Sequence, residues 1–201
     1  MSTTRTDIGR ADSIAVLVIL IAGAGLGGFI AGRGLITGMF RLLDPSRYPI
    51  ELLADIPVSA GSGILDAHGD SLIVTAAALP TSAVWLFALS DLIGAAAIGL
   101  VTAAFAYALA RIVQRKPFHR SMRTAAVIAG LAITFGSLFS QALRGFGQMV
   151  AADDLNPSLG DVAQVGFLFE PLPILIGFAV LALTYVFQAG ARMQKDTEGL
   201  V

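Results

Sequence analysis

The sequence has no cysteine and little charge, and each shortage excludes a class of protein or site. Without cysteine the chain has no disulfides, thiolate metal sites or thiol nucleophiles. Charged residues make up only 13% of the 201 residues, whereas 56% are hydrophobic. The helices of a soluble bundle need a charged face toward water, and the long apolar runs of this sequence offer none. A soluble helical bundle is therefore excluded.

Four apolar runs have the length of membrane spans instead. About 20 apolar residues are enough for a helix to cross about 30 Å of hydrocarbon. A cleaved signal peptide ending near Ala24 is a weaker interpretation of the first run, because apolar residues continue past it for a full span. We therefore predict an all-α integral membrane protein, a single domain over residues 1–201 with four transmembrane helices. The predicted spans are residues 13–32, 84–110, 124–143 and 171–191.

The basic residues predict the orientation of these spans, because short cytoplasmic loops are enriched in Lys and Arg. With the N-terminus inside, nine basic residues fall on the inner side and four on the outer side. Both termini and the loop at residues 111–123 are therefore expected in the cytoplasm. Eleven arginines against two lysines, with abundant Ala and Gly, are typical of a GC-rich bacterial genome. We expect a multi-pass protein of the bacterial cytoplasmic membrane, with the lipid bilayer as a partner.

The segment between the first two spans, residues 44–80, is too polar to cross a membrane. Residues 48–58 and 71–76 have the composition of short strands. The clusters SAGSG and AHGD between them are typical of turns. We predict a small extracytoplasmic insertion that resembles a β-hairpin.

Glycine and proline indicate where the helices pack and where they end. The first span contains two pairs of glycines four residues apart, Gly23 with Gly27 and Gly28 with Gly32. Such pairs allow close helix contact, which we expect within the monomer and not in a dimer. The outer segment at residues 150–170 is acidic and contains an Asn-Pro pair and a glycine, so we expect an irregular connection there.

Polar residues near the outer ends of the spans are candidates for function, because such residues are costly in a membrane. Each span has one charged residue at about the same depth, which predicts an outer-leaflet ring in which Asp91 and Arg144 pair. Gln141 belongs to a polar stripe of the third span that also includes Ser137 and Gln148. Alternatively, these charges only mark where the spans end. The candidate cluster comprises Arg33, Asp91, Gln141, Arg144 and Glu170.

The basic loop at residues 111–123 has three interpretations. Its charge is explained by membrane topology alone, and it is also suited to binding anionic lipid headgroups or to docking a cytoplasmic protein. Pro117 makes the chain turn, which favours exposure of Phe118 beside it. The candidate docking residues are Lys116, Pro117, Phe118 and Arg120.

The sequence contains no recognisable catalytic motif. There is no Gly-rich phosphate loop, no H-E-x-x-H pair and no Ser/His/Asp arrangement. The only histidines, His68 and His119, fall on opposite sides of the predicted membrane, so they cannot share a metal ion or haem. We predict that the chain is not an enzyme and has no cofactor or metal.

Two segments resemble a family of bacterial membrane proteins. They are QRKPFHRSM, a basic residue followed by Pro-Phe after the second span, and the C-terminal LPILIGFAVLALTYVFQAGARMQKDTEGLV. With the order of the spans, they resemble domain of unknown function 2975, although Lys116 stands where that family often has Gly. Genes of the family often neighbour a small helix-turn-helix repressor. The resemblance thus implies a membrane partner of a cytoplasmic helix-turn-helix regulator, with no direct binding of nucleic acid by this chain.

We therefore expect a regulatory or sensory membrane component without catalysis of its own. One alternative is a small transporter or channel subunit, in which Asp91, Arg144 and the polar stripe line a path. The other is a structural or assembly factor of a membrane complex. The sequence favours no particular oligomeric state.

Overall fold

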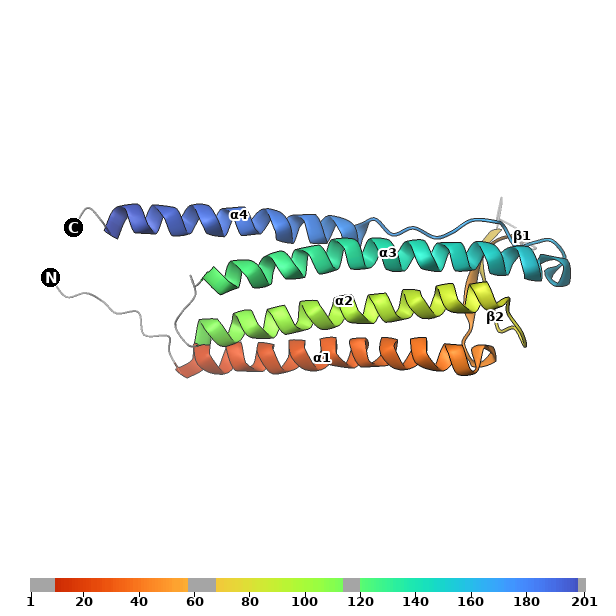
Figure 1. Cartoon of the computed structure of the whole chain (residues 1–201), viewed down its shortest axis with the longest axis horizontal. Coiled ribbons are helices and arrows are strands. Elements are labelled where there is room, and N and C mark those ends of the chain that lie inside the picture. Colours follow the sequence, from red (N-terminus) through yellow and green to blue (C-terminus); the bar gives the residue numbers. More distant parts are fainter. Residues whose placement is uncertain (1–9, 58–67, 114–119, 199–201) are drawn as a thin grey trace, which may run out of the picture. The chain divides into compact units, whose positions relative to one another are not determined.

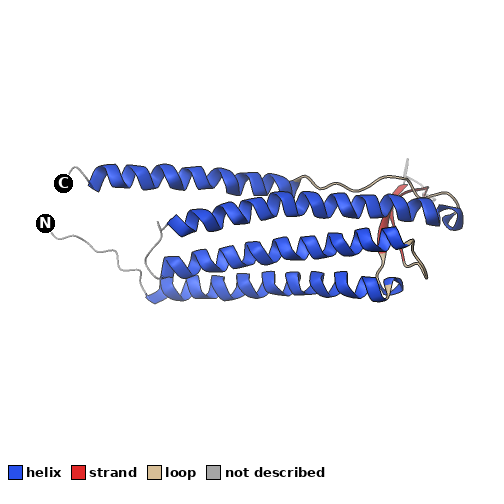
Figure 2. Ribbon diagram, in the orientation of Figure 1, coloured by secondary structure: helices blue, strands red, loops and turns tan. Residues whose placement is uncertain are grey.

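The computed structural model describes residues 10–57, 68–113 and 120–198 (Figure 1). Within these residues there are four long helices, and a two-stranded antiparallel sheet follows the first of them (Figure 2). The prediction of a helical protein with a β-hairpin between its first two helices is confirmed. The elements are α1 (Arg10–Leu43), the 3-10 helix η1 (Pro45–Arg47), β1 (Ile50–Pro57), β2 (His68–Val74), α2 (Thr81–Val113), α3 (Arg120–Leu159) and α4 (Leu172–Glu198).

In the described part of the chain, three helices are long and apolar enough to cross a membrane. They run over Ile14–Leu43, Thr81–Arg111 and Ser121–Leu159, and α4 adds a shorter apolar stretch at Leu172–Tyr185. Large apolar side chains are exposed along these helices, as expected where the surrounding solvent is lipid. These features indicate a multi-pass membrane protein.

Two helices continue well past the predicted spans. α1 has 34 residues and α3 has 40, and at 1.5 Å per residue these are about 51 and 60 Å long, more than the hydrocarbon needs. The predicted irregular connection is wrong for residues 150–159, which are helical. Asp153 and Asp154 do not interrupt the helix, because both residues are exposed to water. Pro157 lies in the last turn of α3, so the loss of its N–H hydrogen bond and the crowding of its ring against the preceding turn disturb only the end of the helix.

A left-handed turn ends α3 and reverses the chain. Gly160 and Asp161 have φ values of +71° and +59°, and the backbone nitrogen of Asp161 donates to the carbonyl of Asn156 at 3.1 Å. This is the bond of a Schellman motif, which favours glycine at the left-handed position. The side-chain oxygen of Asn156 also accepts a hydrogen bond from the nitrogen of Ala163 at 3.0 Å. The turn thereby directs the chain back to the sheet.

Strand β1 is hydrogen-bonded on both edges. One edge pairs with β2, and the other meets residues 162–164. There the nitrogen of Asp55 donates to the carbonyl of Val162 at 3.2 Å, and the nitrogen of Gln164 donates to the carbonyl of Leu53 at 2.8 Å. The two predicted strands agree with β1 and β2 to within three residues at each end. The SAGSG cluster lies outside the described residues.

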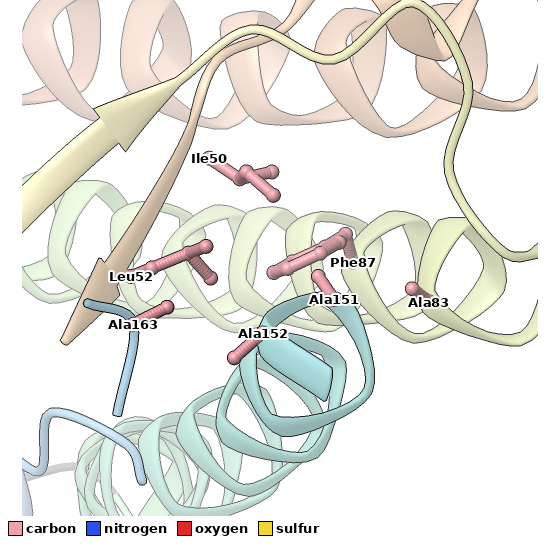
Figure 3. Packing of buried hydrophobic residues seen from close by; sticks show 7 residues of the cluster. All are labelled: Ile50, Leu52, Ala83, Phe87, Ala151, Ala152 and Ala163. Atoms are coloured by element: carbon pink, nitrogen blue, oxygen red, sulfur yellow. The ribbon is translucent and has the colours of Figure 1, made fainter. Parts of the chain in front are cut away.

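A small apolar core lies between the sheet, α2 and α3 (Figure 3). Leu52 of β1 is fully buried in it, and Phe87 of α2 supplies its largest side chain. The helices contribute mostly alanine, whose short side chain lets the strand approach the helix backbone closely. The core residues are Ile50, Leu52, Ala83, Phe87, Ala151, Ala152 and Ala163.

The chain divides into two compact units. One unit consists of Met1–Ala31, Ala97–Phe135 and Pro173–Val201, and the other of Gly32–Ala96 and Gly136–Leu172. The second unit, called the sheet unit below, contains β1, β2 and the apolar core. The first unit is purely helical in its described part.

Close helix contacts at glycine occur in the first unit, as the sequence predicts. Gly23 and Gly27 of α1 face Phe105 and Thr102 of α2, so closely that an added Cβ would collide with these side chains. The expected packing of α1 within the monomer is therefore present for this glycine pair. The other glycine pair of α1 faces open space among the described residues.

Replacing Leu52 by alanine is expected to lower the free energy of unfolding by about 2–5 kcal/mol, because it leaves a cavity in the core. Ile73→Ala in β2 is the matched control, since Ile73 is 72% exposed and its replacement should cost less than about 0.5 kcal/mol. Thermal unfolding of both variants in detergent micelles measures the difference. Equal losses would show that this core does not stabilise the protein.

Candidate functional site: an arginine–aspartate–arginine cluster

The carboxylate of Asp91 on α2 binds one arginine from each of two other helices. Nε of Arg41 on α1 lies 3.1 Å from Oδ2 of Asp91. Nη2 of Arg144 on α3 lies 3.0 Å from Oδ1. Each carboxylate oxygen therefore has its own guanidinium partner, and the three helices are linked within the sheet unit.

The two arginines have different surroundings. The side chain of Arg41 is 9% exposed, whereas that of Arg144 is 56% exposed, with Asp91 between them at 10%. The guanidinium of Arg41 also lies over two aromatic rings, 5.4 Å from the centroid of Tyr48 and 5.3 Å from that of Phe87. Such cation–π contacts stabilise a charge that has lost water. Arg41 is thus a structural residue, and Arg144 is the member of the cluster at the surface.

Two serines, Ser90 and Ser140, hold α2 and α3 in register. Ser90 lies one residue before Asp91, and Ser140 lies four residues before Arg144. The Ser90 hydroxyl donates to the carbonyl of Ser140 at 2.8 Å, and the Ser140 hydroxyl donates to the carbonyl of Ser90 at 3.0 Å. Interhelical hydrogen bonds of this kind are suited to helix packing where water is scarce. Because Arg144 lies one turn after Ser140, this contact places its guanidinium beside Asp91.

The other polar residues of the α3 stripe bind backbone groups. Gln141 accepts from the nitrogen of Glu170 at 2.7 Å and donates to the carbonyl of Glu170 at 3.0 Å. Gln148 donates to the carbonyl of Glu51 in β1 at 2.8 Å. Its Oε1 is buried and has no hydrogen-bond partner among the described residues, as is also true of Nη1 of Arg41. The stripe therefore ties α3 both to the sheet and to the segment before α4.

The structure brings together only part of the cluster predicted from the sequence. The expected Asp91–Arg144 pair is present. Arg33 is exposed and makes no ion pair with any residue in the described ranges. Glu170 binds Gln141 through its backbone nitrogen and carbonyl. Its carboxylate is not part of the cluster.

Sequence reasoning missed Arg41, which is the most buried charged residue of the cluster. The predicted first span ends at residue 32, nine residues before Arg41, whereas α1 continues to Leu43. The sequence does indicate that Arg41 is unusual, since Arg33 and Arg41 are the only charged residues between residues 13 and 43.

Two arginines against one aspartate give the cluster a formal charge of +1.

The structure does not describe the side chains of the four candidate docking residues. Lys116, Pro117 and Phe118 lie outside the described residues. Arg120 is the first residue of α3, and its side chain is likewise outside the described part. The docking hypothesis therefore remains a prediction from the sequence.

An open depression of about 520 Å³ lies beside the sheet and is lined by Leu53, Ala54, Asp55, Asp70 and Gln164. Its two carboxylates come from facing strands. Within the described residues, no three His, Asp or Glu side chains are grouped as metal ligands.

Removing Asp91 should destabilise the protein more than removing Arg144. Asp91→Ala leaves Arg41 buried without its counter-charge, which costs about 3–5 kcal/mol. Arg144→Ala removes a half-exposed partner and should cost less than about 1 kcal/mol. Thermal unfolding in the same detergent compares the two variants. Similar losses for both would contradict the structural role assigned to the buried pair.

Comparison with known proteins identifies no family for this chain. It matches no family model, no curated protein and no solved structure. The resemblance to domain of unknown function 2975 stays a prediction from two sequence segments, and the function has to be argued from the geometry of the chain itself.

Proposed function

We propose that this chain is a four-span protein of the bacterial cytoplasmic membrane, with both termini in the cytoplasm, and that it acts as a regulatory or sensory component. The observation that carries the proposal is the coupling of the sheet to the ion-pair cluster. Gln148 holds β1 and Arg144 holds Asp91 from successive turns of α3. A displacement of the sheet therefore pulls on the helix residue that completes the cluster.

The segment between α3 and α4 supports a membrane boundary near Gln141. After residue 164 the chain runs along α3 without regular secondary structure (Figure 1). Phe167 packs against Gly145, and the backbone of Glu170 bonds to Gln141. Between Gln164 and Glu170 the backbone has no hydrogen-bond partner within the described chain. Such groups need water, so this segment cannot lie in the hydrocarbon.

The same segment exposes Val165, Phe167, Leu168 and Phe169. Apolar and aromatic side chains on a backbone that needs water are suited to the membrane–water interface. Counting back about 20 residues from Gln141 reaches the end of the basic loop, within three residues of the start of the uncharged run at residue 124. The sheet and the Asp91 cluster then lie at or beyond the outer interface, where an external signal has access to them.

The bonds of the polar stripe favour this proposal over a transporter or channel. Gln141, Arg144 and Gln148 each have a partner within the sheet unit. A path for ions or solutes needs polar groups that face water and exchange partners readily. Side chains that hold a loop, an ion pair and a strand are better suited to transmitting a displacement.

On the cytoplasmic side, we propose that the basic loop docks a small helix-turn-helix regulator. The support is the charge of the loop, the turn at Pro117 and the family resemblance of QRKPFHRSM. The membrane protein would then hold or release the regulator according to the state of the sheet unit.

Affinity capture from gently solubilised native membranes tests this partner. The wild type should recover a small DNA-binding protein, and the triple variant Lys116→Ala, Phe118→Ala, Arg120→Ala should not, because it lacks the docking side chains. A matched variant, Arg123→Ala, removes one charge from the same region and should retain the partner. Recovery of no DNA-binding protein by the wild type would contradict the regulatory role.

Labelling of single cysteines tests the membrane boundary, and the absence of native cysteine makes the result unambiguous. Leu168 and Leu131 are a matched pair, since both are 42% exposed. A membrane-impermeant maleimide added to intact cells should label Leu168→Cys, which we place at the outer interface. It should not label Leu131→Cys, which we place in hydrocarbon. Equal labelling would place the boundary elsewhere.

A further inference from the structure

The guanidinium of Arg144 has binding capacity that the protein does not use. An arginine has five N–H donors, and Arg144 makes its ion pair to Asp91 through Nη2 alone. Its other donors have no partner among the residues that the structure describes. More than half of the side chain is exposed, so these donors are open to a ligand.

The charge of the cluster favours an anionic ligand. Asp91 neutralises only one of its two arginines, and Arg41 is held by the other carboxylate oxygen. Arg41 is buried, so Arg144 is the member of the cluster that presents the excess positive charge at the surface. This positive charge repels cations, and a negatively charged ligand would neutralise the cluster.

The position of Arg144 indicates where that anion comes from. It lies three residues after Gln141, at the proposed boundary of the hydrocarbon. The same stretch of chain carries aromatic side chains, with Phe146 exposed two residues further along α3 and Phe167 packed on the adjacent Gly145. An arginine at this depth, on a segment with exposed aromatic residues, suits the layer of lipid headgroups, where the anions are phosphates.

We propose that Arg144 binds the phosphate of an anionic phospholipid. The proposal rests on the membrane placement proposed above. The planar guanidinium suits a phosphate because it can donate two parallel hydrogen bonds. Through Asp91 the bound headgroup is linked to α1 and α2 as well as to α3, so the lipid composition of the outer leaflet acts directly on the cluster.

Native mass spectrometry of the full chain in a neutral detergent tests this site, with phosphatidylglycerol and phosphatidylcholine titrated in parallel. The wild type should retain phosphatidylglycerol in preference to phosphatidylcholine. Arg144→Gln should weaken binding of phosphatidylglycerol about tenfold or more, the effect expected from losing hydrogen bonds to a charged group. Arg33→Gln removes an exposed arginine from α1 that has no described ion pair, and should retain the wild-type preference.

A second variant separates loss of the site from loss of the fold. Asp91→Asn removes the competing negative charge and should bind phosphatidylglycerol more tightly than the wild type, although it is less stable. Weaker binding by Asp91→Asn, or equal losses in the Arg33 and Arg144 variants, would overturn the proposal. Displacement of the lipid by millimolar inorganic phosphate would also overturn it, in favour of a soluble anion. The cysteine labelling tests the membrane placement separately. Equal labelling of Leu168→Cys and Leu131→Cys would contradict that placement, and with it the assignment of the anion to a lipid headgroup.

Discussion

Burial of one arginine is the constraint on which the sheet unit depends. A guanidinium removed from water is tolerated only with a counter-charge and further favourable contacts, and Arg41 obtains these from Asp91, Tyr48 and Phe87. The three partners come from α2 and from the segment after η1. Satisfying one charge therefore determines where α1, α2 and the start of the sheet lie within this unit.

Small residues make that arrangement possible. Alanines on α2 and α3 let β1 lie close to the helices, and Ser90 and Ser140 bring the two helix backbones within hydrogen-bonding reach. The strand needs this support because a two-stranded sheet is at best marginally stable alone. Its second edge is covered by residues 162–164, which the turn at Gly160 directs back to it. The sheet is thus attached to α3 by its core, by Gln148 and by the returning chain.

This attachment gives the proposed sensory role a physical basis. A protein that responds to its surroundings needs an exposed element whose position affects residues elsewhere, and here α3 connects the sheet to the ion-pair cluster. Arg144 differs from the other members because it is bound on one side and open on the other. In the proposed site an anion at this open side competes with Asp91 for Arg144, which would be the residue through which the headgroup layer acts.

The sequence alone determined the helical class, the apolar helices of membrane-spanning length and the two strands, and it made Asp91 and Arg144 a candidate pair because they lie at one depth. The helices and strands follow from local composition, because hydropathy, turn residues and strand-forming residues act over short stretches of chain. The tertiary structure alone decided where the helices end. α1 and α3 continue beyond their uncharged runs because Arg41, Arg144 and Gln148 are bound by other segments of the sheet unit. It also decided that Arg41 completes the cluster, while Arg33 and the carboxylate of Glu170 do not. Depth in the membrane is readable from distance along a helix, but the direction of a side chain around the helix and its partner depend on contacts between segments distant in sequence.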